Sequence, residues 1–394
     1  MRQRLLGTWL VLGFALSPAQ LLAQTAGPGP SYCTQVLQLI QGPQHRKLDS
    51  IKEITVGTFN VLDFGNQKDA KHIAQIAAII KEKNPDILAL QEVQGFDVLA
   101  RFAKNELGDK YYALMTPIKD ARGIQTGFLV KKDLPVTLEL ESHVSEMWVD
   151  PLDTSGAQSA LFPRDLPTLF VRSVGNPDPN EKPLMIVIGT HLKSKRDRPG
   201  DPMSSMLRKA QADRAAEIVT RYHTKYGNNV PLLMVGDFNG RVFDEPEYGA
   251  LAKVAQLQDA MAAEANPPPL ADRTTHTFFP HNGSGPQQNQ IDYALLAPGL
   301  KSDIVEGEVY RYKDPVTGLE RPLPQNSAER DENPSDHFPY FVRMNFTNFL
   351  AKFRGRAPNS VMPVLPQPSK KKKSELLLHR VRPVKSLAPL QDSL

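Results

Sequence analysis

The sequence predicts an α/β fold, because segments typical of strands and helices alternate along it in two stretches that share one plan. In each stretch an apolar strand is followed by a segment with apolar residues at helical spacing and then by a second apolar strand. The first stretch comprises residues 54–59, 68–84 and 87–90, and the second comprises residues 184–188, 205–226 and 232–235. Because helices between strands cover the faces of a sheet, we expect sheets with helices on their outer sides.

The composition is that of an ordinary globular protein. Of the 394 residues, 23% are charged and 40% are hydrophobic, which excludes a disordered, fibrous or disulfide-rich chain. The net charge of +4 is unevenly distributed, because the segment from Phe346 onward has ten Lys and Arg residues against two acids. The region before that segment is acidic, so any affinity for nucleic acid there requires a local basic patch or bound cations.

Four regions follow from these patterns. Residues 1–23 contain two arginines, a short apolar run and small residues near position 23, which is the layout of a cleavable signal peptide. The run is shorter than the roughly 20 residues that a membrane-spanning helix needs, so we expect no stable membrane anchor. We interpret residues 24–50 as an N-terminal lead-in segment, residues 51–346 as the compact domain and residues 347–394 as a disordered, basic, Pro-rich tail. The expected location is the periplasm or the extracellular medium.

Polar residues follow the predicted strands where those strands end. In α/β sheets ligands bind at the strand ends and in the loops that follow them, so we expect these side chains to converge on one cleft. They are Asn60, Glu92, His191, Asp237 and Asn239. A further acid, Asp292, lies inside an apolar strand, where burial costs several kcal/mol without a partner. The imidazole of His337 is an apt partner for it.

Six short motifs occur in a fixed order, and together they carry a resemblance to a known family. They are Gly57-Thr58-Phe59-Asn60, Gln91-Glu92-Val93, Gly189-Thr190-His191, Gly236-Asp237-Phe238-Asn239, Ile291-Asp292-Tyr293 and Ser335-Asp336-His337. This series resembles the endonuclease/exonuclease/phosphatase superfamily, which includes pancreatic-type deoxyribonucleases. The resemblance implies a four-layer α/β sandwich with two packed mixed β-sheets flanked by helices, and a divalent-metal phosphodiesterase site at one end.

The resemblance also implies catalytic roles. Asp237 would orient and deprotonate the attacking water or bind a second metal, and Asn239 would hold the phosphate or that water. His337 would contact the phosphate as a proton-transferring or charge-stabilising imidazole oriented by Asp292, and His191 would be a second phosphate-contacting donor. An Asp-His pair raises the pKa of the imidazole, which keeps it cationic for this role.

The expected metal ligands are Glu92, Asn60 and Asp336. Carboxylate and amide oxygens suit hard cations, which favours Mg²⁺ or Mn²⁺, with Ca²⁺ as a further candidate, over zinc. One position departs from the family pattern, because Leu62 stands where some members have an acid. We therefore rely on Glu92 as the principal ligand.

Three basic residues are candidates for substrate binding. Arg164 resembles the basic residue that often precedes a strand in this family, although a surface arginine beside a turn is an equally good interpretation. Lys193 and Lys195 follow His191 directly and could track a nucleic acid backbone, or they could lie in a solvated loop.

The leading hypothesis is an exported Mg²⁺-dependent nuclease that hydrolyses DNA, and RNA as a second substrate, with low sequence specificity. We expect it to act as a monomer on a nucleic acid substrate. The alternative is a secreted phospholipid phosphodiesterase of the sphingomyelinase type, which would need an apolar docking loop, for which residues 147–149 are the candidate. A third hypothesis is a binding protein that uses the phosphate site without chemistry.

Overall fold

The computed structural model describes residues 35–42, 47–65, 67–174, 180–280 and 284–354. The signal peptide expected at residues 1–23 lies outside these residues, as does the tail beyond residue 354. The chain divides into two compact units, residues 1–358 and 359–394, and every described residue belongs to the first unit. None of the described helices is long and apolar enough to cross a membrane.

Two large sheets form the centre of the first unit. The seven-stranded sheet has the order β1-β6-β9-β10-β11-β15-β12 and the six-stranded sheet has the order β16-β17-β2-β3-β5-β4. The strands of the first are β1 (Gln35–Gln41), β6 (Val136–Ser142), β9 (Thr168–Ser173), β10 (Met185–His191), β11 (Leu232–Asp237), β15 (Asp292–Leu296) and β12 (Gln258–Asp259). Those of the second are β16 (Ile304–Val309), β17 (Tyr340–Asn345), β2 (Glu53–Phe64), β3 (Ile87–Val93), β5 (Gln125–Lys131) and β4 (Tyr111–Met115).

Both sheets are mixed. In each of them one pair of central strands is parallel, β10 with β11 and β2 with β3, and the remaining neighbours are antiparallel. A parallel pair needs a crossover connection, and here the crossovers are helices, as the two strand-helix-strand stretches of the sequence predict. The two parallel pairs are the elements that carry most of the polar strand ends.

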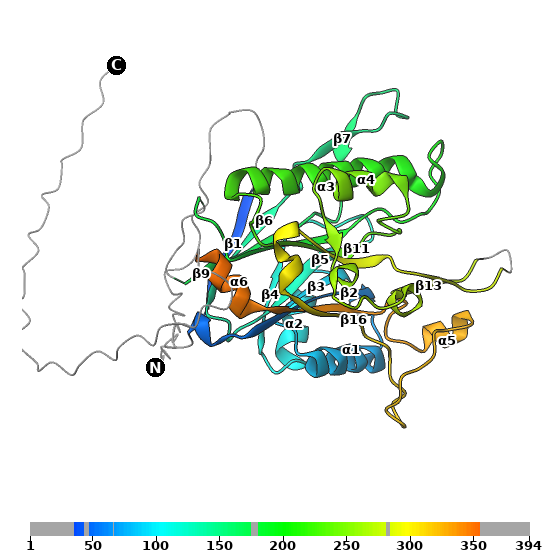
Figure 1. The fold of residues 1–394 in the computed structure, drawn as a ribbon. Helices are drawn as coiled ribbons and strands as arrows, with labels where there is room; N and C mark the ends of the chain where they lie inside the picture. Colours follow the sequence, from blue (N-terminus) through cyan, green and yellow to red (C-terminus); the bar gives the residue numbers. More distant parts are fainter. Residues whose placement is uncertain (1–34, 43–46, 66, 175–179, 281–283, 355–394) are drawn as a thin grey trace, which may run out of the picture. The chain divides into compact units, whose positions relative to one another are not determined.

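Helices cover the outer face of each sheet (Figure 1). The helices α1 (Ala70–Lys83) and α2 (Phe96–Asn105) pack on the six-stranded sheet, and α3 (Ser205–Tyr226) and α4 (Gly249–Lys253) pack on the seven-stranded sheet. The helix α1 begins where the Asp69 side chain accepts a hydrogen bond from the backbone N–H of Lys71, and it ends at Asn84, which has a left-handed backbone. The expected four-layer α/β sandwich is confirmed.

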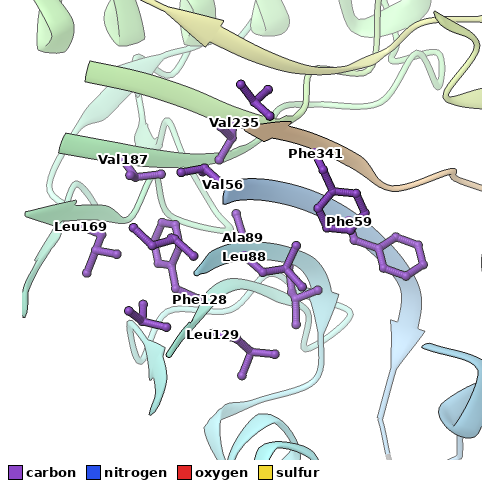
Figure 2. Close-up of a cluster of buried hydrophobic side chains, with 14 of the residues drawn as sticks. Val56, Phe59, Leu88, Ala89, Phe128, Leu129, Leu169, Val187, Val235 and Phe341 are labelled. Carbon is purple, nitrogen blue, oxygen red and sulfur yellow. The ribbon is translucent and has the colours of Figure 1, made fainter. Parts of the chain in front are cut away.

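The main hydrophobic core lies between the two sheets. Figure 2 shows apolar side chains from both sheets filling this space, with Val187 and Val235 from the seven-stranded sheet and Val56 and Phe128 from the six-stranded sheet. All four side chains are fully buried. Burial of this much apolar surface holds the sheets face to face, so the loops at one end of the sandwich share a rigid support.

The boundaries of the compact region are wider than the sequence pattern indicated. The range interpreted as a lead-in segment contains β1, which pairs antiparallel with β6 at the edge of the seven-stranded sheet. The helix α6 (Phe346–Phe353) begins at the last residue of the predicted domain and extends into the range interpreted as a tail, with Phe346, Phe349 and Leu350 buried. The strand was not predicted because apolar and polar residues do not alternate strictly along it. The helix was not predicted because basic residues follow it in the sequence.

Several smaller elements do not belong to the two large sheets. The hairpin of β7 (Met147–Val149) and β8 (Gln158–Ala160) and the hairpin of β13 (His276–Phe278) and β14 (Gln287–Asn289) are separate two-stranded ribbons. A short helix, α5 (Ser327–Asp331), precedes the last motif of the series.

Candidate active site

The predicted strand ends converge at one end of the sandwich. In the seven-stranded sheet His191 is paired with Asp237, and Asp237 is paired with Asp292, so the ends of β10 and β11 meet the beginning of β15. In the six-stranded sheet Asn60 is paired with Gln91, one residue before Glu92. The two groups of residues face each other across the sandwich.

His337 and Asp292 form a hydrogen-bonded pair. Nδ1 of His337 donates to Oδ2 of Asp292 at 2.8 Å, and both side chains are buried. Burial alone would lower the pKa of His337, but the negative charges of Asp292 and Asp237 outweigh it and raise the pKa well above its usual value. The imidazole is therefore cationic at neutral pH, with its Nε2–H free of the pair with Asp292.

Asp237 lies at the centre of the site. Its Oδ2 accepts hydrogen bonds from Nδ2 of Asn60 and Nδ2 of Asn239, both at 3.1 Å. The same oxygen lies 3.4 Å from Nε2 of His191 and 3.8 Å from Nε2 of His337. Burial raises the pKa of Asp237 to about 7, although the cationic His337 opposes this shift. A carboxyl with a pKa near neutrality can exchange a proton with a water molecule.

The backbone before Asp237 requires glycine. Gly236 has a φ of +148°, and a Cβ at this position would lie 2.0 Å from the carbonyl oxygen of Thr190 on the neighbouring strand. The close approach of β10 and β11 therefore depends on the absence of a side chain. It places the carboxylate of Asp237 beside the imidazole of His191.

His191 is enclosed on the side of the cleft by Arg164. Nη1 of Arg164 donates a hydrogen bond to Nε2 of His191, and Nε of Arg164 lies 3.6 Å from Oδ2 of Asp120. Burial, and after it the charge of Arg164, lowers the pKa of His191 well below its usual value, so this imidazole is neutral. Arg164 was expected to face either substrate or solvent; the structure places it in the buried lining of the cleft.

Glu92 lies on the opposite wall of the cleft. It is the penultimate residue of β3 and lies in a β-bulge with a φ of +63°, a conformation that is costly for a residue with a side chain. Its Oε2 accepts a hydrogen bond from the backbone N–H of Asp63 at 3.1 Å, and its Oε1 lies 3.6 Å from Nη2 of Arg122 and 3.8 Å from Nε2 of His191. The strained backbone holds the carboxylate in the cleft.

Asp336 is the third expected metal ligand. Its Oδ1 is a buried oxygen without a hydrogen-bond partner among the described residues, which is a costly state for a carboxylate unless a cation binds it. Burial would raise the pKa of Asp336, but His276 and His337 hold it well below its usual range. The carboxylate is therefore fully ionised and able to bind a cation.

The predicted ligands Glu92, Asn60 and Asp336 do not form a closed cage. Glu92 and Asp336 line the cleft, whereas Asn60 is not among the lining residues and its Oδ1 accepts a hydrogen bond from the backbone N–H of Leu62 at 3.1 Å. Burial lowers the pKa of Lys68, and the charges of Asp336, Asp63 and Glu92 oppose that shift. In the described part of the chain, the two groups of close carboxylate and imidazole atoms are His276, Asp336 and His337, and Asp237, Asp292 and His337. Glu92 belongs to neither group. A metal in the cleft would be held by Glu92 together with Asp336 and would neutralise charge on a bound phosphate.

The side chains line a cleft of about 1330 Å³. The two lysines predicted to bind substrate both line it, but their surroundings differ. Nζ of Lys195 is paired with Oε1 of Glu245, whereas Nζ of Lys193 contacts only the hydroxyl of Ser194 among the described residues. Burial, together with neighbouring arginines, lowers the pKa of Lys193. Of the two lysines, Lys193 is therefore the one whose ammonium is not paired with an acid among the described residues.

Several residues that line the cleft were not predicted from the sequence, among them Asp63, Asp120, Arg122 and His276. Asp120 and Arg122 come from the loop between β4 and β5, Asp63 comes from the bulge in β2, and His276 comes from the β13–β14 hairpin. None of them belongs to a motif of recognisable spacing, and their placement depends on contacts between distant segments. Only Asp63 offered a signal, as the acid directly after Leu62.

Comparisons with known proteins identify the family of the chain. Residues 57–337 match the Endonuclease/Exonuclease/phosphatase family. No curated protein matches the chain. The fold is similar to that of truncated TDP2 from Caenorhabditis elegans, with 20% identity, 74% of this chain and 97% of that chain covered, and a TM-score of 0.48. It is also similar to D. rerio TDP2 complexed with single-strand DNA product, with 14% identity, 74% and 99% covered, and a TM-score of 0.50.

A bacterial structure shares the fold as well. An endonuclease/exonuclease/phosphatase family protein from Bacteroides thetaiotaomicron has 16% identity, with 74% of this chain and 94% of that chain covered and a TM-score of 0.47. At these identities the likeness concerns the fold. The sequence match, which spans most of the chain and contains all six motifs, carries the assignment: this protein belongs to the endonuclease/exonuclease/phosphatase family.

Proposed function

We propose that this protein is an exported, Mg²⁺-dependent phosphodiesterase that hydrolyses DNA, and RNA as a second substrate, with low sequence specificity. The observation that carries the proposal is the position of the Asp237 carboxylate between two imidazoles, with Nε2 of His191 at 3.4 Å and Nε2 of His337 at 3.8 Å. In-line attack of water on a phosphodiester needs a base that accepts the proton of the water and a charged donor that stabilises the phosphoryl oxygens.

Asp237, His337 and His191 each have a separate proposed role in hydrolysis. Asp237, held by Asn60 and Asn239, accepts the proton of the attacking water, because its pKa lies at about 7. His337 is cationic and donates from Nε2 to a phosphoryl oxygen, while Asp292 fixes its ring through Nδ1. His191 is kept neutral beside Arg164, and the guanidinium supplies the positive charge on that side of the phosphate.

The donor set fits a hard divalent cation. Glu92, Asp336 and Asn60 offer oxygen ligands, and the unpartnered Oδ1 of Asp336 supports cation binding. Mg²⁺ or Mn²⁺, with Ca²⁺ as a further candidate, would be held by these residues and would neutralise charge on the phosphoryl oxygens. Replacement of Asp336 by Asn should weaken Mg²⁺ binding, measured by titration calorimetry of the purified chain.

Nucleic acid is the favoured substrate class. The cleft offers Lys193 and Arg122 beside the buried Arg164, which suits a polyanion with phosphates on both sides of the cleaved bond. The test is incubation of the purified chain with supercoiled plasmid and with a labelled single-stranded oligonucleotide, in Mg²⁺ and in chelator. The proposal predicts metal-dependent cleavage; intact DNA under every metal tried would refute it.

One observation favours a second candidate substrate. The β7–β8 hairpin exposes Met147 and Val149, and Leu152 follows on the connecting loop, so an apolar surface is available for a lipid bilayer. Trp148 is less suited, because it is half-buried under the guanidinium of Arg198. Release of choline phosphate from sphingomyelin vesicles would establish sphingomyelin as a substrate and would contradict the proposal that DNA is the substrate.

Export is proposed from the N-terminal sequence. Arg2 and Arg4 precede a twelve-residue apolar run, as in a secretory signal peptide, and these residues lie outside the described part of the chain. Sequencing of the mature N-terminus after expression tests the proposal. Cleavage after Ala23 is expected, and an intact Met1 on protein that remains in the cytoplasm would contradict export.

A further inference from the structure

An exposed aromatic ring projects from the β13–β14 hairpin into the lining of the cleft. Phe278 is 46% exposed, and it lines the same cleft as His191, Asp237 and His337. The next residue, Phe279, packs against the guanidinium of Arg330. For Phe278, by contrast, no aromatic ring or cation of the described residues stacks on its face. Hydrolysis of a phosphodiester does not by itself require an exposed aromatic ring in the cleft, so the position of Phe278 calls for another role.

The hairpin that carries Phe278 is fastened to the catalytic imidazole. His276 forms an isolated β-bridge with His337, and the centres of the two rings are 4.7 Å apart. The hydroxyl of Thr275 accepts a hydrogen bond from the backbone N–H of Asp292 at 2.9 Å, and the backbone N–H of Phe338 donates to the carbonyl of Thr275 at 2.7 Å. The ring of Phe278 is therefore mounted on a rigid support.

Strand geometry places the ring on the side of the active site. Residues two apart in a strand share a face, so Phe278 lies on the face of His276, about 7 Å further along. That spacing is within the span between a phosphate and its own base in a nucleotide. Thr277, on the other face, is fully buried, which fixes the orientation of the strand.

Amide side chains lie opposite the ring. In the antiparallel register Phe278 is paired with Gln287 and His276 is paired with Asn289, and both amide residues line the cleft. An aromatic face beside amide donors and acceptors matches a nucleobase, which has a π-face and a hydrogen-bonding edge. A bilayer-docking surface would instead have apolar neighbours.

We propose that Phe278 is a stacking platform for the unpaired base of a nucleotide next to the cleaved phosphodiester, with Gln287 and Asn289 at the edge of that base. This inference rests on the proposed nucleic acid hydrolysis and specifies its substrate class. A base inside a duplex cannot present its face to a side chain without leaving the stack. The protein therefore prefers single-stranded nucleic acid, or strand ends, to intact duplex.

The test compares two fluorescent single-stranded dodecamers, one of thymidines and one in which every base is replaced by hydrogen. Binding is measured by anisotropy in chelator, so that no strand is cut. The parent should bind the thymidine oligomer about tenfold more tightly, because stacking on an aromatic side chain stabilises each bound base. Phe278→Ala should bind both oligomers equally, and Phe278→Tyr should recover the preference.

The matched control is Phe243→Ala. Phe243 is 47% exposed, like Phe278, but it does not line the cleft. This variant should keep the preference for bases. Equal binding of both oligomers by the parent, or a preference that survives in Phe278→Ala, would overturn the platform while leaving the proposed nuclease intact. Failure of the parent to bind either oligomer would count against the platform and the nuclease together.

Discussion

The Asp292 carboxylate and the His337 imidazole are joined by a 2.8 Å hydrogen bond between Oδ2 and Nδ1, although 45 positions separate them in the sequence. The bond connects the first residue of β15 in one sheet to the segment that leads into β17 in the other. This ionic hydrogen bond thus links both halves of the sandwich at the candidate active site. It also fixes the face that the ring presents to the cleft.

Replacement of Asp292 by Asn should lower kcat/KM for DNA hydrolysis by about 10²-fold or more, a typical loss for a disturbed proton-transferring group. Asp292 raises the pKa of His337 against the effect of burial, and the proposed mechanism requires the cationic form. The decline of activity with rising pH should therefore occur at lower pH in the variant. A pH–rate profile with an unmoved alkaline limb in a folded variant would contradict the role of Asp292.

Lys193→Ala and Lys195→Ala should differ, although the two residues are neighbours. The ammonium of Lys195 is already paired with Glu245, whereas Lys193 has only Ser194 as a described partner. Loss of a phosphate-contacting cation reduces the slope of log K against log salt by about 1. We expect that reduction for Lys193→Ala and a smaller one for Lys195→Ala, measured by titrations of DNA at several salt concentrations. The reverse order would show that the Glu245 pair opens for substrate.

Gly236→Ala should destabilise the fold and abolish activity. The added Cβ would meet the carbonyl of Thr190 at 2.0 Å in a backbone of φ +148°. The expected loss in free energy of unfolding is at least about 2 kcal/mol. Gly249→Ala is the control, because it begins α4 with no atom within 4 Å of the new Cβ. Urea denaturation of both variants tests the difference, and equal stabilities would be inconsistent with the strand contact.

The stability of the protein should depend on the ionisation of Glu141, a residue that does not line the cleft. Its side chain is 12% exposed, and burial raises its pKa to about 7, although the hydrogen bond from Tyr222 opposes the shift. The folded protein binds this proton more tightly than the unfolded chain, so stability falls as pH rises from about 4.5 to 7.

Glu141→Gln removes that titration. Its free energy of unfolding relative to the parent should therefore rise by roughly 1–3 kcal/mol between pH 5 and pH 8. Denaturant titrations of both proteins at the two pH values measure this difference. A constant difference would mean that Glu141 ionises at its ordinary pKa in the folded protein.

Local pattern was enough to predict the scaffold. The α3 helix spans the predicted residues 205–226, and β10 and β11 end at His191 and Asp237 as expected. The strands β2 and β3 continue beyond Asn60 and Glu92, to Phe64 and Val93. These elements depend on apolar periodicity within one segment, which the sequence carries directly. The edge strand β1 and the helix α6 were not predicted, because the first lacks alternation and the second lies in a basic context.

The walls of the cleft were harder to predict than its centre. Asp237 and His337 belong to motifs whose order along the chain is informative. Asp120 and Arg122 come from a loop and His276 comes from the strand β13, and their position depends on how distant segments pack. The burial of Arg164 against His191 likewise depends on the assembled sheets, since its local sequence is equally compatible with an exposed turn.

The most direct test of the central claim is the rate of DNA cleavage in Mg²⁺ by the parent, His337→Ala and His223→Ala. His223 is a histidine of α3 outside the cleft and serves as the matched control. We predict parental cleavage for His223→Ala and a loss of about 10²-fold or more for His337→Ala. Cleavage at the parental rate by a folded His337→Ala variant would contradict the assignment of the imidazole and of the site built around it.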